Sequence, residues 1–158
     1  MSDKSDSIAT LDSKYQEFRA KISGLPADAY GEVWLGEWNL AQLLGHMTGW
    51  FGEMTVGLKR VAIGERPTPE GVNYSDADAW NAKFIATASA GAAALGDFDG
   101  AYASYRDAAT ALPEDKFGED SQTGKPRIGG RLLDGPGIHH FDEHRPQIDE
   151  WLSKRNPG

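Results

Sequence analysis

The chain has 158 residues, with 16 Lys and Arg against 24 Asp and Glu, four His and no Cys, and its formal net charge is −8. This length fits one domain with a hydrophobic core of its own. Without Cys, the chain forms no disulfide scaffold, zinc ribbon or thiol nucleophile. The acidic balance argues against a nucleic-acid or anionic-membrane surface. No apolar run reaches the roughly 20 residues of a membrane span, and the polar start, MSDKSDS, lacks the apolar core of a signal peptide. We therefore expect a cytoplasmic protein with no membrane or nucleic-acid partner.

Apolar residues recur at the steps of three and four that an amphipathic helix requires, and not at the alternation of a strand. Residues 1–6 are polar, and we expect them to be a disordered tail. Residues 7–155 are predicted to form a single helical domain. The first helix ends at Gly24 and Pro26, and its apolar stripe is Ile8, Leu11, Tyr15, Phe18, Ile22 and Leu25.

A second helix is predicted from Leu40 to Ile63. Asn39 and Gln42 form an Asn analogue of the capping box at its start. Three glycines lower the helix propensity of this segment, but they let a neighbouring backbone or a ligand approach closely. These glycines are Gly45, Gly49 and Gly52.

Further helices are predicted to begin near Ser75 and at Asp97. Residues 113–133 are polar and Gly-rich, which indicates a long connection with room for a short hairpin. The last helix is predicted to begin near residues 134–136 and to run to about Ser153. The predicted fold class is therefore all-α: a four-helix bundle with long crossover connections and extra short helices.

The histidines carry the most chemical information in the sequence. His140 and His144 are four residues apart, so on a helix their side chains stack on one face. The apolar Ile148 lies on the same face, which places the pair toward the core. His46 lies beside the apolar stripe of the second helix, whereas His139 points elsewhere. If the bundle brings three of them together, they form an all-nitrogen metal site with open positions, as in catalytic rather than structural sites.

Other interpretations of these residues stay open. An i, i+4 His pair alone is a weak metal signal, and a lone core histidine such as His46 is more often hydrogen-bonded than metal-bound. Burying two unpaired imidazoles is costly, however, and a bound ion offsets that cost. Trp50 lies one turn after His46 and serves either as core packing, which we favour, or as a pocket wall. Gln147 or Asp142 could orient a ligand imidazole through its second nitrogen.

Glu53 is seven residues after His46 and therefore shares its helix face. It is our one candidate catalytic residue, as a general base. The alternatives are an outer partner of a metal ligand and a solvated charge, and we favour these two over the general base.

Two segments resemble the DinB-like (YfiT-like) metalloenzyme family, which includes the metal-binding domain of mycothiol-dependent maleylpyruvate isomerase. They are WNLAQLLGH, from Trp38 to His46, and HFDEHRPQ, from His140 to Gln147. The order and separation of the helices also fit this family over nearly the whole chain. The resemblance implies a divalent ion, zinc or nickel, held by His46, His140 and His144, and a homodimer. Members of known activity are often thiol-linked transferases or isomerases that use a low-molecular-weight thiol.

Two features depart from the usual pattern of this family. Pro146 lies two residues after His144 and should kink the last helix, because proline lacks the backbone N–H. The run Gly135-Pro136-Gly137 should weaken the turn before the histidine pair.

Two classes of function follow. The first is a divalent-metal-dependent enzyme, either a thiol-linked transferase or isomerase or a hydrolase, that acts on a small molecule at the three-His site. Because the chain has no Cys, any thiol must come from a cosubstrate. The alternative is a non-catalytic, stress-related bundle that binds a metal or a small molecule. Since only neutral imidazole binds a metal, we predict that occupancy falls as the pH drops through roughly 6.

Overall fold

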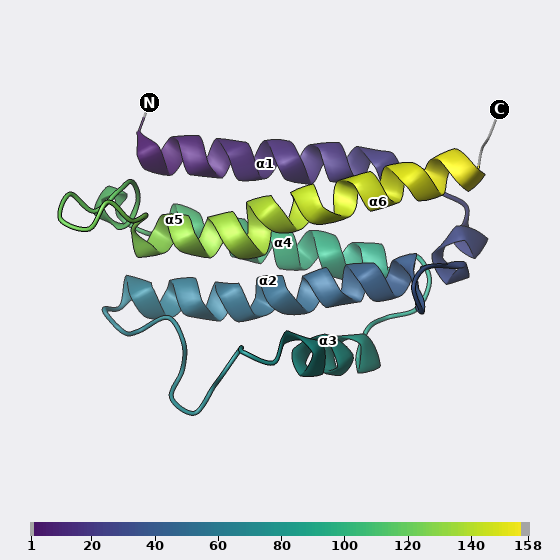
Figure 1. The fold of residues 1–158 in the computed structure, drawn as a ribbon, viewed down its shortest axis with the longest axis horizontal. Coiled ribbons are helices and arrows are strands. Elements are labelled where there is room, and N and C mark those ends of the chain that lie inside the picture. Colours follow the sequence, from purple (N-terminus) through teal and green to yellow (C-terminus); the bar gives the residue numbers. More distant parts are fainter. Residues whose placement is uncertain (1, 156–158) are drawn as a thin grey trace.

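The computed structural model describes residues 2–155, which are mostly helical, as predicted. Three long helices and the run from α5 to α6 lie side by side, and α3 lies on the outer side of α2 (Figure 1). The helices are α1 (Asp3–Ile22), α2 (Leu40–Ala62), α3 (Ala77–Ala86), α4 (Ala93–Thr110), α5 (Ile128–Leu133) and α6 (His140–Arg155). In residues 2–155, no helix is long and apolar enough to cross a membrane.

Several short elements connect the helices. They are the 3₁₀ turns η1 (Ala27–Gly31) and η2 (Glu114–Lys116), the strands β1 (Val33–Leu35) and β2 (Trp38–Asn39), and the π-helical turn η3 (Asp134–His139). The two strands form an antiparallel pair that the helical periodicity did not predict. The expected long connection contains one isolated bridge between Glu119 and Pro126, followed by α5.

The N-terminal segment is a helix and not a tail. Ser2 caps α1, and its side chain exchanges hydrogen bonds with Ser5 in a capping box. The Ser2 hydroxyl also donates to Glu114, 3.1 Å away, which ties the start of α1 to the segment after α4. The predicted disordered tail is therefore wrong from residue 2 onward, because serines that look merely polar in sequence satisfy the first backbone N–H groups of α1. Met1 lies outside the described residues.

The starts of the other helices follow their caps. Asn39 Oδ1 accepts from the Gln42 backbone N–H, and Gln42 Oε1 accepts from the Asn39 N–H, both at 2.9 Å, which forms the predicted capping box of α2. α3 begins after Asp76, whose side chain accepts from Ala79 at 3.1 Å. α4 begins at Ala93, about one turn before the predicted cap at Asp97.

The core lies between the long helices, and it draws on the predicted stripes of α1 and α2. Leu11, Phe18 and Ile22 of α1 are fully buried. Phe51 of α2 stacks on Tyr105 of α4, with ring centroids 5.1 Å apart. Burial of these large apolar side chains is the main favourable term in the folding of the bundle.

Helices α1 and α4 also carry the same spacing of Asp, Tyr and Arg, and the two sets bind each other. The sets are Asp12, Tyr15 and Arg19 on α1 and Asp99, Tyr102 and Arg106 on α4. Each carboxylate accepts hydrogen bonds from the tyrosine hydroxyl and the arginine of the opposite helix, and the Arg Nε atoms lie 2.9–3.2 Å from the carboxylate oxygens. The rings of Tyr15 and Tyr102 stack on each other, with their centroids 3.8 Å apart. Burial, followed by the nearby Asp99, raises the pKa of Tyr15 to about 12, so its hydroxyl remains a donor.

We predict that Asp12→Ala lowers the free energy of unfolding by about 1–2 kcal/mol, because it leaves the Tyr102 hydroxyl without its acceptor in a buried position. Urea unfolding measures the change. The control is Glu150→Ala, which removes an exposed ion pair with Lys154 and should have no measurable effect. Equal stability of the Asp12 variant and the wild type would contradict a structural role of the reciprocal pairs.

Candidate metal centre

Three buried histidines from two helices meet in the interior of the protein. His46 comes from α2, and His140 and His144 come from consecutive turns of α6. Their side chains are 6%, 8% and 5% exposed, respectively. One ring nitrogen from each lies within 4.8 Å of the others, and His46 Nε2 is 2.8 Å from His140 Nε2. The structure thus brings together the three predicted histidines, while His139 is exposed and lies apart.

The second ring nitrogen of His46 is held by α3. Its Nδ1 lies 2.7 Å from Asn81 Oδ1, and the Trp50 indole N–H donates to the same oxygen at 2.7 Å. An indole N–H can only donate, so the Asn81 atom between the two rings must be the oxygen. That oxygen can only accept, so His46 carries its proton on Nδ1. Its Nε2 therefore offers a lone pair to the centre.

The other two histidines are held in the same way. His140 Nδ1 donates to the carbonyl of Pro136 at 3.2 Å, and His144 Nδ1 donates to Gln147 Oε1 at 2.7 Å. Gln147, one of the two predicted partners, thus fixes the orientation of a ligand ring. Asp142 instead pairs with Lys14 at 2.8 Å.

These contacts leave three Nε2 lone pairs facing one another. With both Nδ1 atoms protonated, no proton remains between His46 Nε2 and His140 Nε2. His144 Nε2 is buried without any hydrogen-bond partner. Buried nitrogens are rarely left in this state, because an unsatisfied polar group in the interior costs roughly 1–3 kcal/mol. A divalent cation satisfies all three lone pairs, so these residues fit a metal ion.

Burial keeps the ligands neutral. It lowers the pKa of His46 to about 4, with a smaller contribution from His144. Burial, followed by the neighbouring His144 and His46, lowers the pKa of His140 to about 3. Neutral imidazole is the form that binds metal. For these two ligands, proton competition therefore begins well below the pH of 6 expected from an exposed imidazole.

The π-helical turn η3 positions His140. Pro136 has no N–H to donate to the carbonyl of Leu132, one helical turn earlier, and the Tyr105 hydroxyl donates to that carbonyl instead. Gly137 lies against the same hydroxyl, since a Cβ at this position would be only 2.8 Å from it. The Gly-Pro-Gly run, expected to be weak, is thus held by α4 and continues into α6. α6 also continues through Pro146.

Two of the four glycines of α2 allow α3 to approach. A Cβ on Gly45 would clash with Ala88, and a Cβ on Gly49 would clash with the Phe84 ring, whereas Gly52 faces open space. This close packing places Asn81 beside His46. The sequence analysis did not identify Asn81, although one signal was present: Asn81 is the only polar side chain on the helix face formed by Ala77, Asn81, Phe84 and Ala88.

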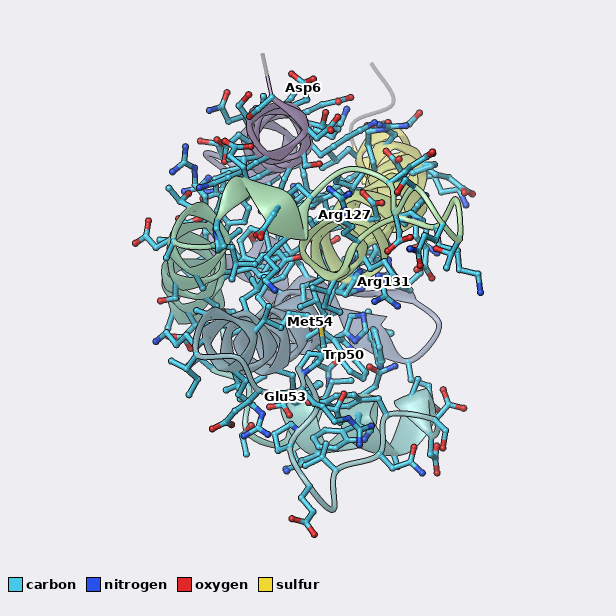
Figure 2. The ribbon with its side chains drawn as sticks, turned by 90° about the vertical axis from the view of Figure 1, so that its left-hand side faces the viewer. Asp6, Trp50, Glu53, Met54, Arg127 and Arg131 are labelled. Carbon is cyan, nitrogen blue, oxygen red and sulfur yellow. The ribbon has the colours of Figure 1, made fainter. Side chains whose placement is uncertain are left out.

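A cavity of about 600 Å³ opens onto the three histidines. Its walls include Trp50 and Met54, which Figure 2 shows on the side of α2 that faces α6 and α3. Trp50, which we expected to be core packing, is half-buried and lines this cavity. Glu143, whose side chain is exposed, also lines the cavity.

Glu53 is not among the residues that line the cavity. Its carboxylate accepts a hydrogen bond from the Tyr74 hydroxyl at 3.1 Å, and Tyr74 is one of the cavity walls. The geometry therefore connects Glu53 to the site through Tyr74, and gives it no direct contact with the histidines.

Solved structures share this fold. An uncharacterized protein from Clostridium difficile 630 superimposes with a TM-score of 0.77 and 11% identity over 97% of each chain. A protein from Streptococcus pneumoniae gives a TM-score of 0.75 and 14% identity over 97% of this chain and 92% of that one. The sibling lethal factor precursor DfsB gives a TM-score of 0.75 and 16% identity over 99% of this chain and 98% of that one. At these identities the similarity establishes the fold alone. No family model and no curated protein matches the sequence.

The lowered pKa values predict how the metal-free protein responds to acid. Below about pH 6.5, unfolded chains protonate His46 and His140, whereas the folded protein does so only near pH 4 and 3. Stability should therefore fall as the pH drops through this window, by up to about 1.4 kcal/mol per pH unit for each group. Urea unfolding in the presence of a chelator measures the free energy of unfolding from pH 7 to 5. This free energy should fall less steeply with pH in His46→Gln than in the wild type. The exposed His139→Gln is the control, and a His46→Gln profile as steep as the control would contradict the assignment.

A second prediction concerns the contact between α2 and α3. Gly49→Ala forces the Phe84 ring away and with it Asn81, so we expect a loss of about 1–3 kcal/mol in stability. Metal affinity should fall about tenfold, as is typical when an outer partner of a ligand is lost. Isothermal titration with Zn²⁺ measures this. Gly52→Ala is the matched control: it lies on the same helix in open space and should bind Zn²⁺ normally. Equal Zn²⁺ affinities of the two variants would contradict the role of α3.

Proposed function

We propose that this chain is a divalent-metal-dependent enzyme with a DinB-like four-helix bundle, in which His46, His140 and His144 hold one zinc or nickel ion. The observation that carries the proposal is the buried Nε2 of His144, which has no hydrogen-bond partner and lies within 4.8 Å of the other two ligand nitrogens. A hydrogen-bonded core histidine, the main alternative from sequence, would not leave this nitrogen unpaired.

The arrangement supports a catalytic rather than a structural metal. Structural zinc sites are closed by four protein ligands, whereas three ligands leave a position for water or substrate. Here the open side is the cavity of about 600 Å³, large enough for a small molecule. The ion, when bound, would polarise the substrate or lower the pKa of a bound water or thiol. Since the chain has no Cys, sulfur chemistry at this site requires a low-molecular-weight thiol as cosubstrate.

The residues of this chain prepare the site for such chemistry. The oxygens of Asn81, Pro136 and Gln147 hold the ligand rings with Nε2 inward. The apolar side chains in the walls lower the local dielectric, which strengthens the electrostatic interactions inside the cavity. The reaction classes that fit are thiol-linked group transfer or isomerisation, and hydrolysis.

We assign Glu53 a positioning role rather than that of the general base. Burial, followed by the charge of Glu53, raises the pKa of Tyr74 to about 12. The hydroxyl therefore keeps its proton and donates a hydrogen bond to Glu53. This fixes the Tyr74 ring as a wall of the cavity. The homodimer, the thiol cosubstrate and the cytoplasmic location are proposals that rest on the resemblance to the DinB-like family.

Elemental analysis of untagged protein tests the proposal. We expect about one zinc or nickel ion per chain, a Tm that falls on chelation, and loss of both properties in His140→Ala. His139→Ala, one residue away and exposed, should keep the ion. Absence of a stoichiometric ion, together with a Tm of His140→Ala that chelation leaves unchanged, would overturn the metal site.

The loaded protein is then assayed with ester and amide substrates, and with electrophiles in the presence of small thiols. Turnover that depends on the ion supports the enzyme. A bound ion without turnover in any of these assays supports the non-catalytic binding bundle instead.

A further inference from the structure

The cavity at the three histidines has a one-sided charge. Of the residues that line it, Glu143 is the only charged one, and no Lys or Arg is among them. This contrasts with the chain as a whole, which has 16 Lys and Arg. An anion that entered the cavity would meet one carboxylate and no protein cation.

Two cations of the surrounding helices bind partners outside the cavity lining. Arg145, next to the ligand His144, pairs with Asp142 at 3.2 Å and with Glu17 at 3.7 Å. Lys83 of α3 lies over the ring of Trp80, 4.8 Å from its centroid. Both side chains are thus engaged outside the cavity.

The uncharged walls are mostly apolar. Trp38, Trp50 and Tyr74 contribute aromatic surface, and Met54 and Pro136 contribute aliphatic surface. The indole N–H of Trp50 already donates to Asn81, and the hydroxyl of Tyr74 already donates to Glu53. Trp50 and Tyr74 therefore offer the substrate ring surface rather than hydrogen-bond donors.

We infer that the substrate is a small molecule with an aromatic or aliphatic body that is uncharged or cationic, and that Glu143 selects against carboxylate-bearing analogues. The inference rests on the proposed function, because it places one donor group of the substrate, such as a thiol, at the three histidines. A divalent ion at the histidines would attract any anionic donor group. The effect of Glu143 is therefore compared among molecules that carry the same donor group and differ only in the charge on the rest of the molecule.

The size of the effect follows from the exposure of Glu143. Its side chain is exposed, so solvent weakens its repulsion of a second carboxylate. At a dielectric close to that of water, two like charges about 4 Å apart shift binding by about fivefold, and the partial enclosure of the cavity raises this toward about tenfold. A cationic group at the same place gains a similar factor.

Three matched probes test this: phenylmethanethiol, 4-(mercaptomethyl)benzoate and 4-(mercaptomethyl)benzylamine. Each has the same thiol on the same ring. The protein is loaded with Co²⁺, and the probes are titrated at one pH while the thiolate-to-cobalt absorption band is followed; the thiol proton passes to the buffer. We expect the benzoate to bind about fivefold to tenfold more weakly than phenylmethanethiol, and the benzylamine to bind at least as tightly as phenylmethanethiol.

Two charge-matched variants complete the experiment. Glu143→Gln should bring the affinity for the benzoate close to that for phenylmethanethiol. Glu150→Gln removes one negative charge from α6 away from the cavity lining and should leave the difference unchanged. Binding of the benzoate as tightly as phenylmethanethiol in the wild type would overturn the inference, as would an unchanged difference in Glu143→Gln.

Failure of the metal proposal is distinguishable from failure of this inference. If the protein binds no Co²⁺, the proposed function fails, and calorimetry of the metal-free protein with 4-methylbenzylamine and 4-methylbenzoate still measures the charge selection of the cavity. Tighter binding of the amine, lost in Glu143→Gln, upholds the selection, and equal binding overturns it.

Discussion

The arrangement of this site depends on one constraint: each of the three buried histidines donates a hydrogen bond from its Nδ1–H to an oxygen. For His46 the constraint is strict, because the Trp50 indole can only donate and so identifies the Asn81 atom as the oxygen. The backbone carbonyl of Pro136 plays the same part for His140. Once the protons are on Nδ1, the three Nε2 lone pairs converge, and a cation at the point where they meet would satisfy all three.

Much of the surrounding structure serves this constraint at a local cost. Gly45 and Gly49 weaken the intrinsic helix propensity of α2 by roughly 1 kcal/mol each, yet they are what allows α3 to bring Asn81 to His46. The π-helical turn places a proline where a helical N–H is needed, and the Tyr105 hydroxyl of α4 supplies the missing donor. α3 itself has no buried residue, so its position depends on these contacts with α2. The hydrophobic core between the long helices therefore supports α3 and η3, which bury few side chains of their own.

The sequence predicted the features that depend on neighbours along the chain. The capping box at Asn39, the stripes of α1 and α2, and the i, i+4 pair at His140 all follow from helix geometry. The contact of this pair with His46 spans 94 positions, and it was expected from the family resemblance rather than from helix geometry. The sequence did not predict Asn81, whose contact with His46 spans 35 positions. The start of α1 was missed for the same reason, since part of its support comes from Glu114, 112 positions away from Ser2. Helical phase alone made Glu53 a candidate catalytic residue, but Tyr74, in the loop before α3, binds its carboxylate, and Glu53 does not line the cavity.

Burial links the protonation of the ligands to the selectivity of the cavity. The apolar surroundings that lower the pKa of His46 and His140 keep both rings neutral over most of the physiological pH range. Glu143 is exposed, so solvent screens its charge in part, and the apolar walls keep this screening below that of an open surface. The proposed metal binding and the proposed charge selection then depend on one feature, the aromatic and aliphatic walls around the histidines. A change that lets water into these walls should weaken both together, because it would raise the local dielectric for the ligands and for Glu143 alike.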